Sequence, residues 1–156
     1  MHPAVRDWVR THTKSNYLKV LEVGSRDING GVRDLIAADF YHGVDLYPGP
    51  GVDQVANARN LEGRYDLVAC LEVLEHDPDA SGLIQHLGRL CAPGGLVVAT
   101  AGGPGREPHS AHDGAGLRDG EHYRNLDELH FLVAWGEVVA CQIADTDWRV
   151  VWRKFG

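Results

Sequence analysis

Short apolar runs alternate with polar turns along the chain, and this alternation predicts its secondary structure. Strands are expected at residues 17–23, about 40–46, about 54–56, 65–71, 96–100, 138–143 and 148–153. Residues 65–71 form an apolar run of the kind found in strands that are buried on both faces of a parallel sheet. The last two runs follow each other after a short turn, which favours an antiparallel hairpin.

Helices are expected in three places between these strands. They lie near residues 32–36, at about 80–91, and from Asn125 onward. The second has the clearest amphipathic stripe, formed by Leu83, Ile84, Leu87, Leu90 and Cys91. At the third, Asn125 precedes Glu128 by three positions, a variant of the capping box that opens many helices. Alternating strands and helices predict an α/β fold with a doubly wound, mostly parallel sheet.

Two links between expected strands are unusually short. Residues 47–53 join the second strand to the third, and residues 57–64 join the third to the fourth. A parallel crossover usually needs about a dozen residues and often contains a helix. We therefore expect some covering helices to be missing, and the apolar surface left bare would suit a homodimer interface.

Polar and glycine residues gather where the expected strands end. The first strand ends at Gly24, and glycine lets the backbone approach a ligand closely. Arg26 stands where the G-x-G-x-x-G fingerprint of dinucleotide-binding proteins has its second glycine. Asp45, at the end of the second strand, suits the two hydroxyls of a ribose. After the third strand, Asn57 and Ala58 can hydrogen-bond an adenine edge, although Asn57 is equally suited to a plain turn.

Carboxylates and a histidine follow the fourth strand, where catalytic groups of such sheets collect. They are Glu72, Glu75 and His76. Helix capping is the alternative explanation for Glu75. These residue types at a strand end predict a catalytic corner next to the cofactor positions.

The long polar loop at residues 101–124 brings further histidines. Histidine is the natural general base near neutral pH, and four histidines can fill this role: His76, His109, His112 and His122. Of these, His76, His109 and His112 are taken as the candidate catalytic residues. The alternative is a solvated loop with incidental histidines. Asp113 adds a further ligand type beside them, but no fixed ligand spacing identifies a metal, and none is assigned. A glycine-rich loop of this length also suits a closing lid.

Five motifs in this order resemble the class I methyltransferases that use S-adenosylmethionine (SAM), over nearly the whole chain. They are LEVGS at 21–25, VDL at 44–46, ANA at 56–58, YDLV at 65–68 with EVLEH at 72–76, and LCAPGG at 90–95. The resemblance implies a Rossmann-like sheet with a closing antiparallel hairpin. It also implies SAM as cofactor and S-adenosylhomocysteine (SAH) as product.

The resemblance further implies where SAM lies. The residues expected near it are Glu22, Gly24 and Ser25 at its amino-acid part, Asp45 and Leu46 at ribose and adenine, Asn57 and Ala58 at the adenine edge, and Leu71 and Glu72 near the methionine part. Arg26 departs from the family pattern by replacing a glycine. It is expected to reach the SAM carboxylate, and Asn29 is expected nearby.

Composition further narrows the kinds of protein to which this chain can belong. A chain of 156 residues, 44% hydrophobic and 24% charged, fits a single globular domain over residues 1–156. The start of the chain lacks the apolar stretch of a signal peptide, so a cytoplasmic location is expected. The formal charge of -7 weighs against a general nucleic-acid binder. The three cysteines lie in apolar runs, which predicts buried free thiols.

These observations predict a methyltransferase acting on an oxygen or nitrogen of a small molecule or a presented side chain. Methyltransferases that act on exocyclic amines of nucleic acids often carry Asn/Asp-Pro-Pro-aromatic after the fourth strand, where this chain has Leu-Glu-Val-Leu at 71–74. Two alternatives remain open. One is a non-catalytic SAM-binding or partner-binding subunit of a larger complex, and the other is a nucleotide-dependent oxidoreductase.

Overall fold

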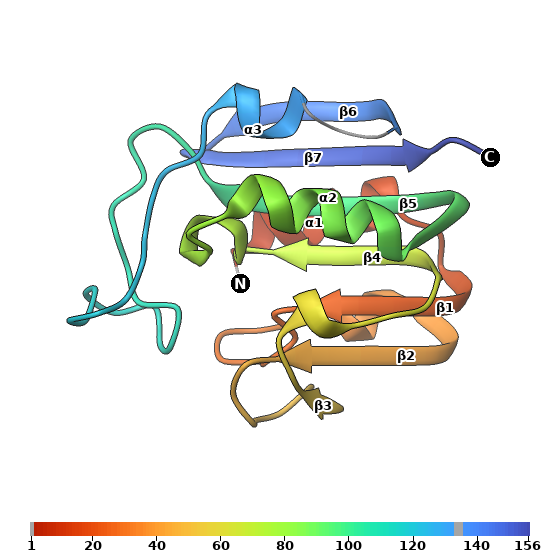
Figure 1. Cartoon of the computed structure of the whole chain (residues 1–156), viewed down its shortest axis with the longest axis horizontal. Helices are drawn as coiled ribbons and strands as arrows, with labels where there is room; N and C mark the ends of the chain where they lie inside the picture. The colour runs from red at the N-terminus through yellow and green to blue at the C-terminus, as the bar shows by residue number, and fades with distance from the viewer. Residues whose placement is uncertain (1, 133–135) are drawn as a thin grey trace.

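The computed structural model of this protein, which describes residues 2–132 and 136–156, is built around one seven-stranded sheet (Figure 1). Its strand order is β3-β2-β1-β4-β5-β7-β6. The strands are β1 (Asn16–Val23), β2 (Ala37–Asp45), β3 (Gln54–Val55), β4 (Tyr65–Leu71), β5 (Cys91–Gly102), β6 (Gly136–Ala144) and β7 (Asp147–Lys154). β1 to β5 run parallel, whereas β7 is antiparallel to both β5 and β6. The expected mostly parallel sheet with an antiparallel C-terminal hairpin is confirmed.

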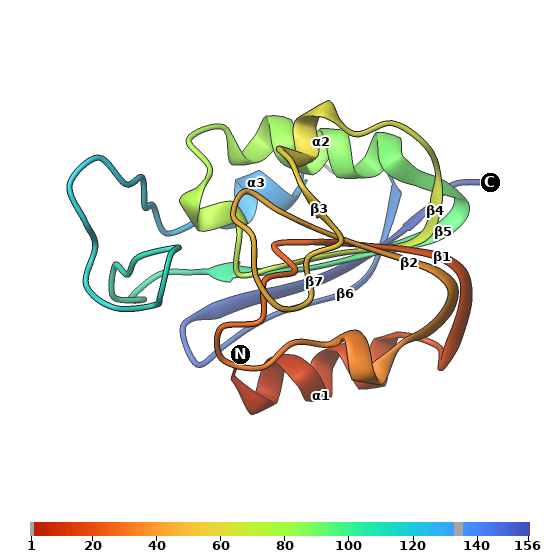
Figure 2. The same cartoon turned by 90° about the horizontal axis from the view of Figure 1, so that it is seen from below.

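Helices cover both faces of the sheet (Figure 2). α1 (Pro3–His12) lies on one face, and α2 (Ala80–Leu90) and α3 (Glu128–Leu132) lie on the other. Two buried apolar clusters result, one on each side of the strands. The sheet is therefore a middle layer whose central strands β4 and β5 are buried on both faces, as the apolar run at 65–71 predicted.

Two expected helices differ from the structure. The one near residues 32–36 is a single 3-10 turn, η1 (Arg33–Leu35), flanked by the buried side chains of Val32 and Ile36. The third helix begins at Glu128 rather than Asn125, because the Asn125 side-chain amide donates to the carbonyl of Arg106 at 3.0 Å and does not cap a helix. Residues 133–135, where the expected third helix would continue, lie outside the described residues.

The side of the sheet formed by β2 and β3 has little helical cover, as expected. β3 is two residues long, and the connection to β4 contains only the turn η2 (Ala58–Asn60). Phe40 and Val55 are 51% and 54% exposed on these strands. The prediction of missing helices is thus confirmed, and it has a visible consequence in the exposed apolar side chains.

Cysteine burial follows the position of each strand in the sheet. Cys70 on β4 and Cys91 at the start of β5 are buried free thiols, as expected. The same expectation is wrong for Cys141, which is exposed because β6 is an edge strand. Within the described residues, no helix has the length and apolar character needed to cross a membrane.

Candidate functional site

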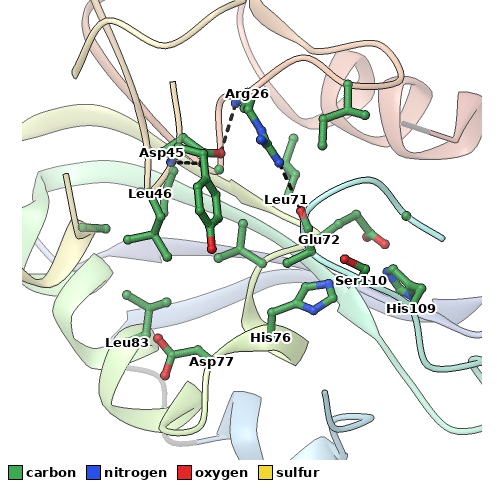
Figure 3. A pocket seen from close by; sticks show the side chains of 18 of the residues that line it. Arg26, Asp45, Leu46, Leu71, Glu72, His76, Asp77, Leu83, His109 and Ser110 are labelled. Carbon is green, nitrogen blue, oxygen red and sulfur yellow. Dashed lines mark hydrogen bonds between the residues drawn. The ribbon is translucent and has the colours of Figure 1, made fainter. Parts of the chain in front are cut away.

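A cavity of about 1240 Å³ opens at the carboxyl ends of the parallel strands. The four strand-end positions singled out in the sequence, Gly24, Asp45, Asn57 and Leu71, all line it. Figure 3 shows Asp45 and Leu46 on one side of the cavity, with His76 and His109 on the other. Because this volume exceeds the usual range for a single small-molecule pocket, there is room for a cofactor and an acceptor together.

Most residues expected near a cofactor line this cavity. They are Gly24, Arg26, Asn29, Asp45, Leu46, Asn57, Ala58, Leu71 and Glu72. Glu22 and Ser25 are not among the lining residues, and both are buried. The structure therefore brings together positions that are up to about fifty residues apart in the sequence, because parallel strands share one carboxyl edge.

Gly24 forms the floor of the cavity in a conformation that requires glycine. Its φ is +77°, and its N–H donates to the carbonyl of Val44 at 2.9 Å. A Cβ atom at this position would come within 2.3 Å of Cγ2 of Val73. The glycine is needed both for its backbone angle and for the close approach of the segment after β4.

The Asp45 carboxylate is held in a fixed orientation at the end of β2. Its Oδ1 accepts from the N–H of Tyr47 at 2.9 Å, and its Oδ2 accepts from the N–H of Arg26 at 3.3 Å. Each carboxylate oxygen has about two acceptor directions, so each can still accept another hydrogen bond. This is the arrangement needed to bind two neighbouring hydroxyl groups.

Asn57 has the turn role that the sequence left open. Its Oδ1 accepts from the N–H of Arg59 at 2.9 Å and caps η2. Asn57 and the neighbouring Ala58 nevertheless both line the cavity. Capping thus explains the residue type at 57, while the adenine contact stays a prediction.

Glu22 is a buried acid behind the cofactor side of the cavity. It is 4% exposed, and its Oε2 accepts a hydrogen bond from the Tyr41 hydroxyl at 2.7 Å. Burial raises the pKa of Glu22 to about 7, although the Tyr41 hydrogen bond acts in the opposite direction. The folded chain therefore keeps this carboxyl protonated at pH values where an unfolded chain has lost the proton.

We expect Glu22→Gln to remove a pH dependence of stability. Between the ordinary pKa of 4.5 and the folded value of about 7, the folded state binds one more proton than the unfolded state. The free energy of unfolding of the wild type should therefore fall as pH rises through this window, by about 2–3 kcal/mol between about pH 5 and pH 8. Glutamine keeps an acceptor for Tyr41 and has no proton to lose. Urea unfolding at both pH values checks this. An equal change in the free energy of unfolding of the wild type and Glu22→Gln between the two pH values would contradict it.

Three rings meet at the opposite end of the cavity. The centroids of His76 and His109 are 5.0 Å apart, and Tyr123 lies 5.3 Å from His76 and 5.0 Å from His109. Burial lowers the pKa of His76 to about 4, so its imidazole is neutral at pH 7. His76 comes from η3 (Leu74–His76), whereas the other two come from the long segment after β5. Two of the three candidate catalytic histidines, His76 and His109, are thus brought together.

His112 lies apart from this pair. Its ring packs edge-on against Tyr47 at a centroid distance of 5.4 Å, and it is not among the residues that line the cavity. The structure therefore separates the three candidate catalytic histidines into one pair and one distant residue. A catalytic part for His112 stays a prediction without geometric support.

Buried carboxylates lie beneath the ring cluster. Glu75 is fully buried, and its Oε1 accepts from the N–H of Gly102 at 3.0 Å. Burial, followed by the charge of Glu72, raises the pKa of Glu75 to about 8. Glu72 has a φ of +57° and lies 3.9 Å from Arg106, whose guanidinium is also 3.2 Å from Asp147. The Arg106 guanidinium thus partly neutralises the negative charge of the Glu72 and Asp147 carboxylates.

One group of potential metal-ligand atoms occurs among the described residues. Glu75, His76 and His109 each offer an atom, and these atoms all lie within 4.8 Å of one another. The sequence suggested other possible metal ligands, namely His109, His112 and Asp113. The structure does not bring those three into such a group. The difference arises because the first set combines the end of β4 with the loop, which local spacing cannot show.

Several residues that line the cavity were not identified from the sequence. They are Ile28, Tyr47, Val73, Asp77, Leu83, Arg106, Pro108 and Ser110. Asp77 was the most accessible to sequence reasoning, because it directly follows the EVLEH motif. In the structure it forms an ion pair with Arg59 at 2.7 Å. Arg106 and Ser110 belong to a loop without periodic pattern, so their approach to the cavity depends on tertiary contacts alone.

Comparison with known proteins agrees with this geometry. A methyltransferase-domain family matches residues 13–138 of the chain. The ubiquinone biosynthesis O-methyltransferase of Erwinia tasmaniensis is 29% identical over 119 residues, covering 62% of this chain and 48% of that protein. That of Azotobacter vinelandii is 31% identical over 117 residues, covering 62% and 50%. The chain thus spans about half the length of the curated relatives it matches.

Solved structures share the fold at low sequence identity. The magnesium protoporphyrin IX methyltransferase of Synechocystis, crystallised with SAM, has a TM-score of 0.63 at 18% identity, covering 97% of this chain and 76% of that one. The 1,6-didemethyltoxoflavin-N1-methyltransferase of Burkholderia thailandensis, crystallised with its acceptor and SAH, has a TM-score of 0.68 at 15% identity, covering 99% and 78%. At these identities the similarity establishes a shared fold.

Proposed function

The chain belongs to the methyltransferase-domain family, and from this premise we propose that it is a SAM-dependent methyltransferase whose active site is the cavity at the strand ends. One observation carries the proposal. Four residues at or just after the ends of the four strands β1 to β4 line a single cavity: Gly24, Asp45, Asn57 and Leu71. The curated relatives, which are named as O-methyltransferases, support the same reaction class.

In the proposed complex, the turn after β1 and the end of β2 hold the adenosine part of SAM. The two oxygens of Asp45 accept the ribose hydroxyls, Leu46 packs against adenine, and Asn57 with Ala58 meets the adenine edge. The methionine part lies along Leu71 and Glu72. Gly24 lines the cavity beside Asp45 and Leu71, which supports a path of the ligand over the turn after β1.

The acceptor side of the cavity is formed by His76, His109 and Ser110 (Figure 3). SAM supplies an electrophilic methyl group, so the protein must mainly align the acceptor atom with the methyl–sulfur bond and exclude water. As the new bond to the acceptor oxygen or nitrogen forms, the bond to sulfur breaks and SAH leaves. The acceptor proton passes to the imidazole of His109, next to the neutral His76.

A small molecule is the proposed acceptor. The solved relatives include enzymes named for porphyrin and toxoflavin acceptors, and the curated relatives are named for ubiquinone biosynthesis. The names of the curated relatives favour oxygen as the acceptor atom. The net charge of -7 supports a small molecule over nucleic acid.

Turnover of SAM to SAH tests the proposal. The protein is incubated with methyl-labelled SAM and, in separate reactions, with phenols, catechols and aromatic amines. We expect SAH and a labelled product to form in equal amounts with at least one acceptor class. If SAH binds but no acceptor class yields product, the alternative of a non-catalytic SAM-binding subunit replaces the enzyme. If NAD binds and SAH does not, the alternative of a nucleotide-dependent oxidoreductase replaces the methyltransferase.

Asp45→Asn is expected to weaken SAH binding by roughly 10- to 100-fold. The amide keeps one acceptor for the N–H of Tyr47, but it loses the charge and the second acceptor oxygen that would bind the ribose hydroxyls. Titration calorimetry measures the change. Asp39→Asn, at the exposed start of the same strand, is the matched control and should leave affinity within about twofold. Equal affinity of the wild type and Asp45→Asn would contradict the proposed ribose contact.

Three further parts of the proposal concern the whole protein. We expect a cytoplasmic enzyme, a single folded domain over residues 1–156, and a homodimer through the apolar side chains exposed on β2 and β3. Sedimentation velocity tests the last point, and a purely monomeric protein at micromolar concentration would contradict it.

A further inference from the structure

Arg26 connects the turn after β1 to the far side of the cavity. Its backbone N–H donates to Asp45, which keeps the start of the side chain in place. The guanidinium then donates to the carbonyl of His112 at 2.6 Å and lies 3.5 Å from that of Ala111. These two carbonyls are more than eighty residues away in the sequence, so Arg26 joins two segments that no strand pairing connects.

The loop after β2 is shaped to let this side chain pass. The guanidinium carbon of Arg26 lies 5.1 Å from the centre of the Tyr47 ring, which also packs edge-on against the ring of His112. A Cβ atom at Gly49 would come within 2.7 Å of Cγ of Arg26, so the space for the arginine depends on the glycine. Three segments that surround the cavity thus meet at one side chain.

The part of the long segment that Arg26 contacts is a compact turn. The N–H of Gly114 donates to the carbonyl of Ser110 at 2.8 Å, and the N–H of Ser110 donates to the carbonyl of Ala115 at 2.8 Å. The Ser110 hydroxyl donates to Glu121 at 2.7 Å. Because His109 directly precedes this turn, a hydrogen bond that holds the turn also restrains the backbone from which the His109 side chain extends.

This turn and the residues before it form one wall of the cavity. Residues 106–111 and 114–116 are among its lining residues. From β5 to α3 the segment extends beyond the carboxyl ends of the parallel strands, which is the side from which a ligand would enter (Figure 1). The contact made by Arg26 joins this wall to the turn after β1, whereas the contacts made by Arg106 join it to Glu72 and Asp147.

We propose that Arg26 is a positioning residue that fastens segment 106–116 across the cavity, holding His109 at the acceptor side and enclosing the bound cofactor. The proposal rests on the proposed function and deepens it, because it gives Arg26 a part other than binding the SAM carboxylate. A charged, planar guanidinium donating to two carbonyls suits this part, and lysine would replace only some of it.

Hydrogen exchange of the cofactor-free protein tests the fastening. Arg26→Ala should raise exchange in residues 106–116 by at least about tenfold, with β4 unchanged, and Arg26→Lys should restore part of the protection. Arg33→Ala is the matched control, because Arg33 lies in the same connection but bonds Gly51 and Asp53 and not the long segment. Tyr47→Leu, which removes only the ring contact, should give an intermediate rise. Unchanged exchange in both Arg26→Ala and Tyr47→Leu would overturn the proposal.

Release of SAH tests the enclosure. Stopped-flow displacement should show SAH leaving Arg26→Ala at least about tenfold faster than the wild type, with kcat lowered and partly restored by Arg26→Lys. Faster exchange with an unchanged release rate would overturn the enclosure. An unchanged exchange with weaker SAH binding would assign Arg26 to the carboxylate instead. Because the exchange experiment needs no cofactor, its result stands apart from the proposed function, which fails if the wild type binds no SAH.

Discussion

His109→Gln is expected to lower kcat by about 10²- to 10⁴-fold while leaving the Kd for SAH within about twofold, because a general base contributes to the transition state of proton transfer and not to cofactor binding. His109 lines the acceptor side of the cavity, and its ring lies 5.0 Å from those of His76 and Tyr123. Steady-state turnover of SAM with the acceptor found for the wild type, together with calorimetric titration of SAH, separates the two effects.

The control for this prediction is His122→Ala. His122 belongs to the same long segment but has an exposed side chain, so its loss should change kcat by less than about twofold. A decrease in kcat of less than about threefold in His109→Gln would contradict the role of His109 as general base. The acceptor would then lose its proton without help from this residue, as an acceptor that is already ionised in solution does.

Gly24→Ala is expected to weaken SAH binding by at least about 100-fold. The new Cβ atom would lie 2.3 Å from Cγ2 of Val73, which is a stiff β-branched side chain, and the backbone would keep a φ of +77° that alanine disfavours. The turn after β1 and the segment after β4 cannot both keep their places, and both line the cavity. Titration calorimetry with SAH measures the loss.

Gly94→Ala isolates the cause of this effect. Gly94 has nearly the same backbone angle, a φ of +76°, but a Cβ atom there would meet nothing within 4 Å. Both variants therefore carry a similar backbone strain, and only Gly24→Ala disturbs the cavity. We expect Gly94→Ala to bind SAH as the wild type does. Equal affinity in the two variants would show that the turn after β1 does not form the floor of the cofactor site.

The strands and the cavity could be predicted because their signals are local. The apolar run at 65–71 is β4 to the residue, and glycine or polar residues mark where β1, β2 and β3 end. Parallel strands then bring these ends to one edge, so motifs that are far apart in the sequence meet without any knowledge of their contacts. For the same reason Gly24, Asp45 and Leu71 lie where the sequence placed them.

α1 was missed although its signal was present. Val5, Trp8 and Val9 recur at helical spacing and are buried against the sheet. Proline at the first helical position, which favours a helix start, was a second indication.

The detailed course of the long segment after β5 could not be predicted from the sequence, because it depends on single long-range contacts. Arg106 pairs with Asp147, and Arg26 reaches the carbonyl of His112. Neither contact produces a periodic pattern or a fixed spacing along the chain. Sequence reasoning therefore placed His112 in one catalytic set with His76 and His109, whereas the structure groups His109 with His76 and Tyr123 and leaves His112 against Tyr47.

Calorimetric titration of the purified chain with SAH, followed by NAD, tests the central claim most directly, since both ligands contain adenosine but only one lacks a pyrophosphate. The account predicts that one SAH binds per chain with a Kd in the micromolar range or below, and that NAD at about 1 mM neither binds nor displaces it. Absence of SAH binding at about 1 mM, or tighter binding of NAD, would contradict the claim that the carboxyl edge of this sheet is a site for SAM.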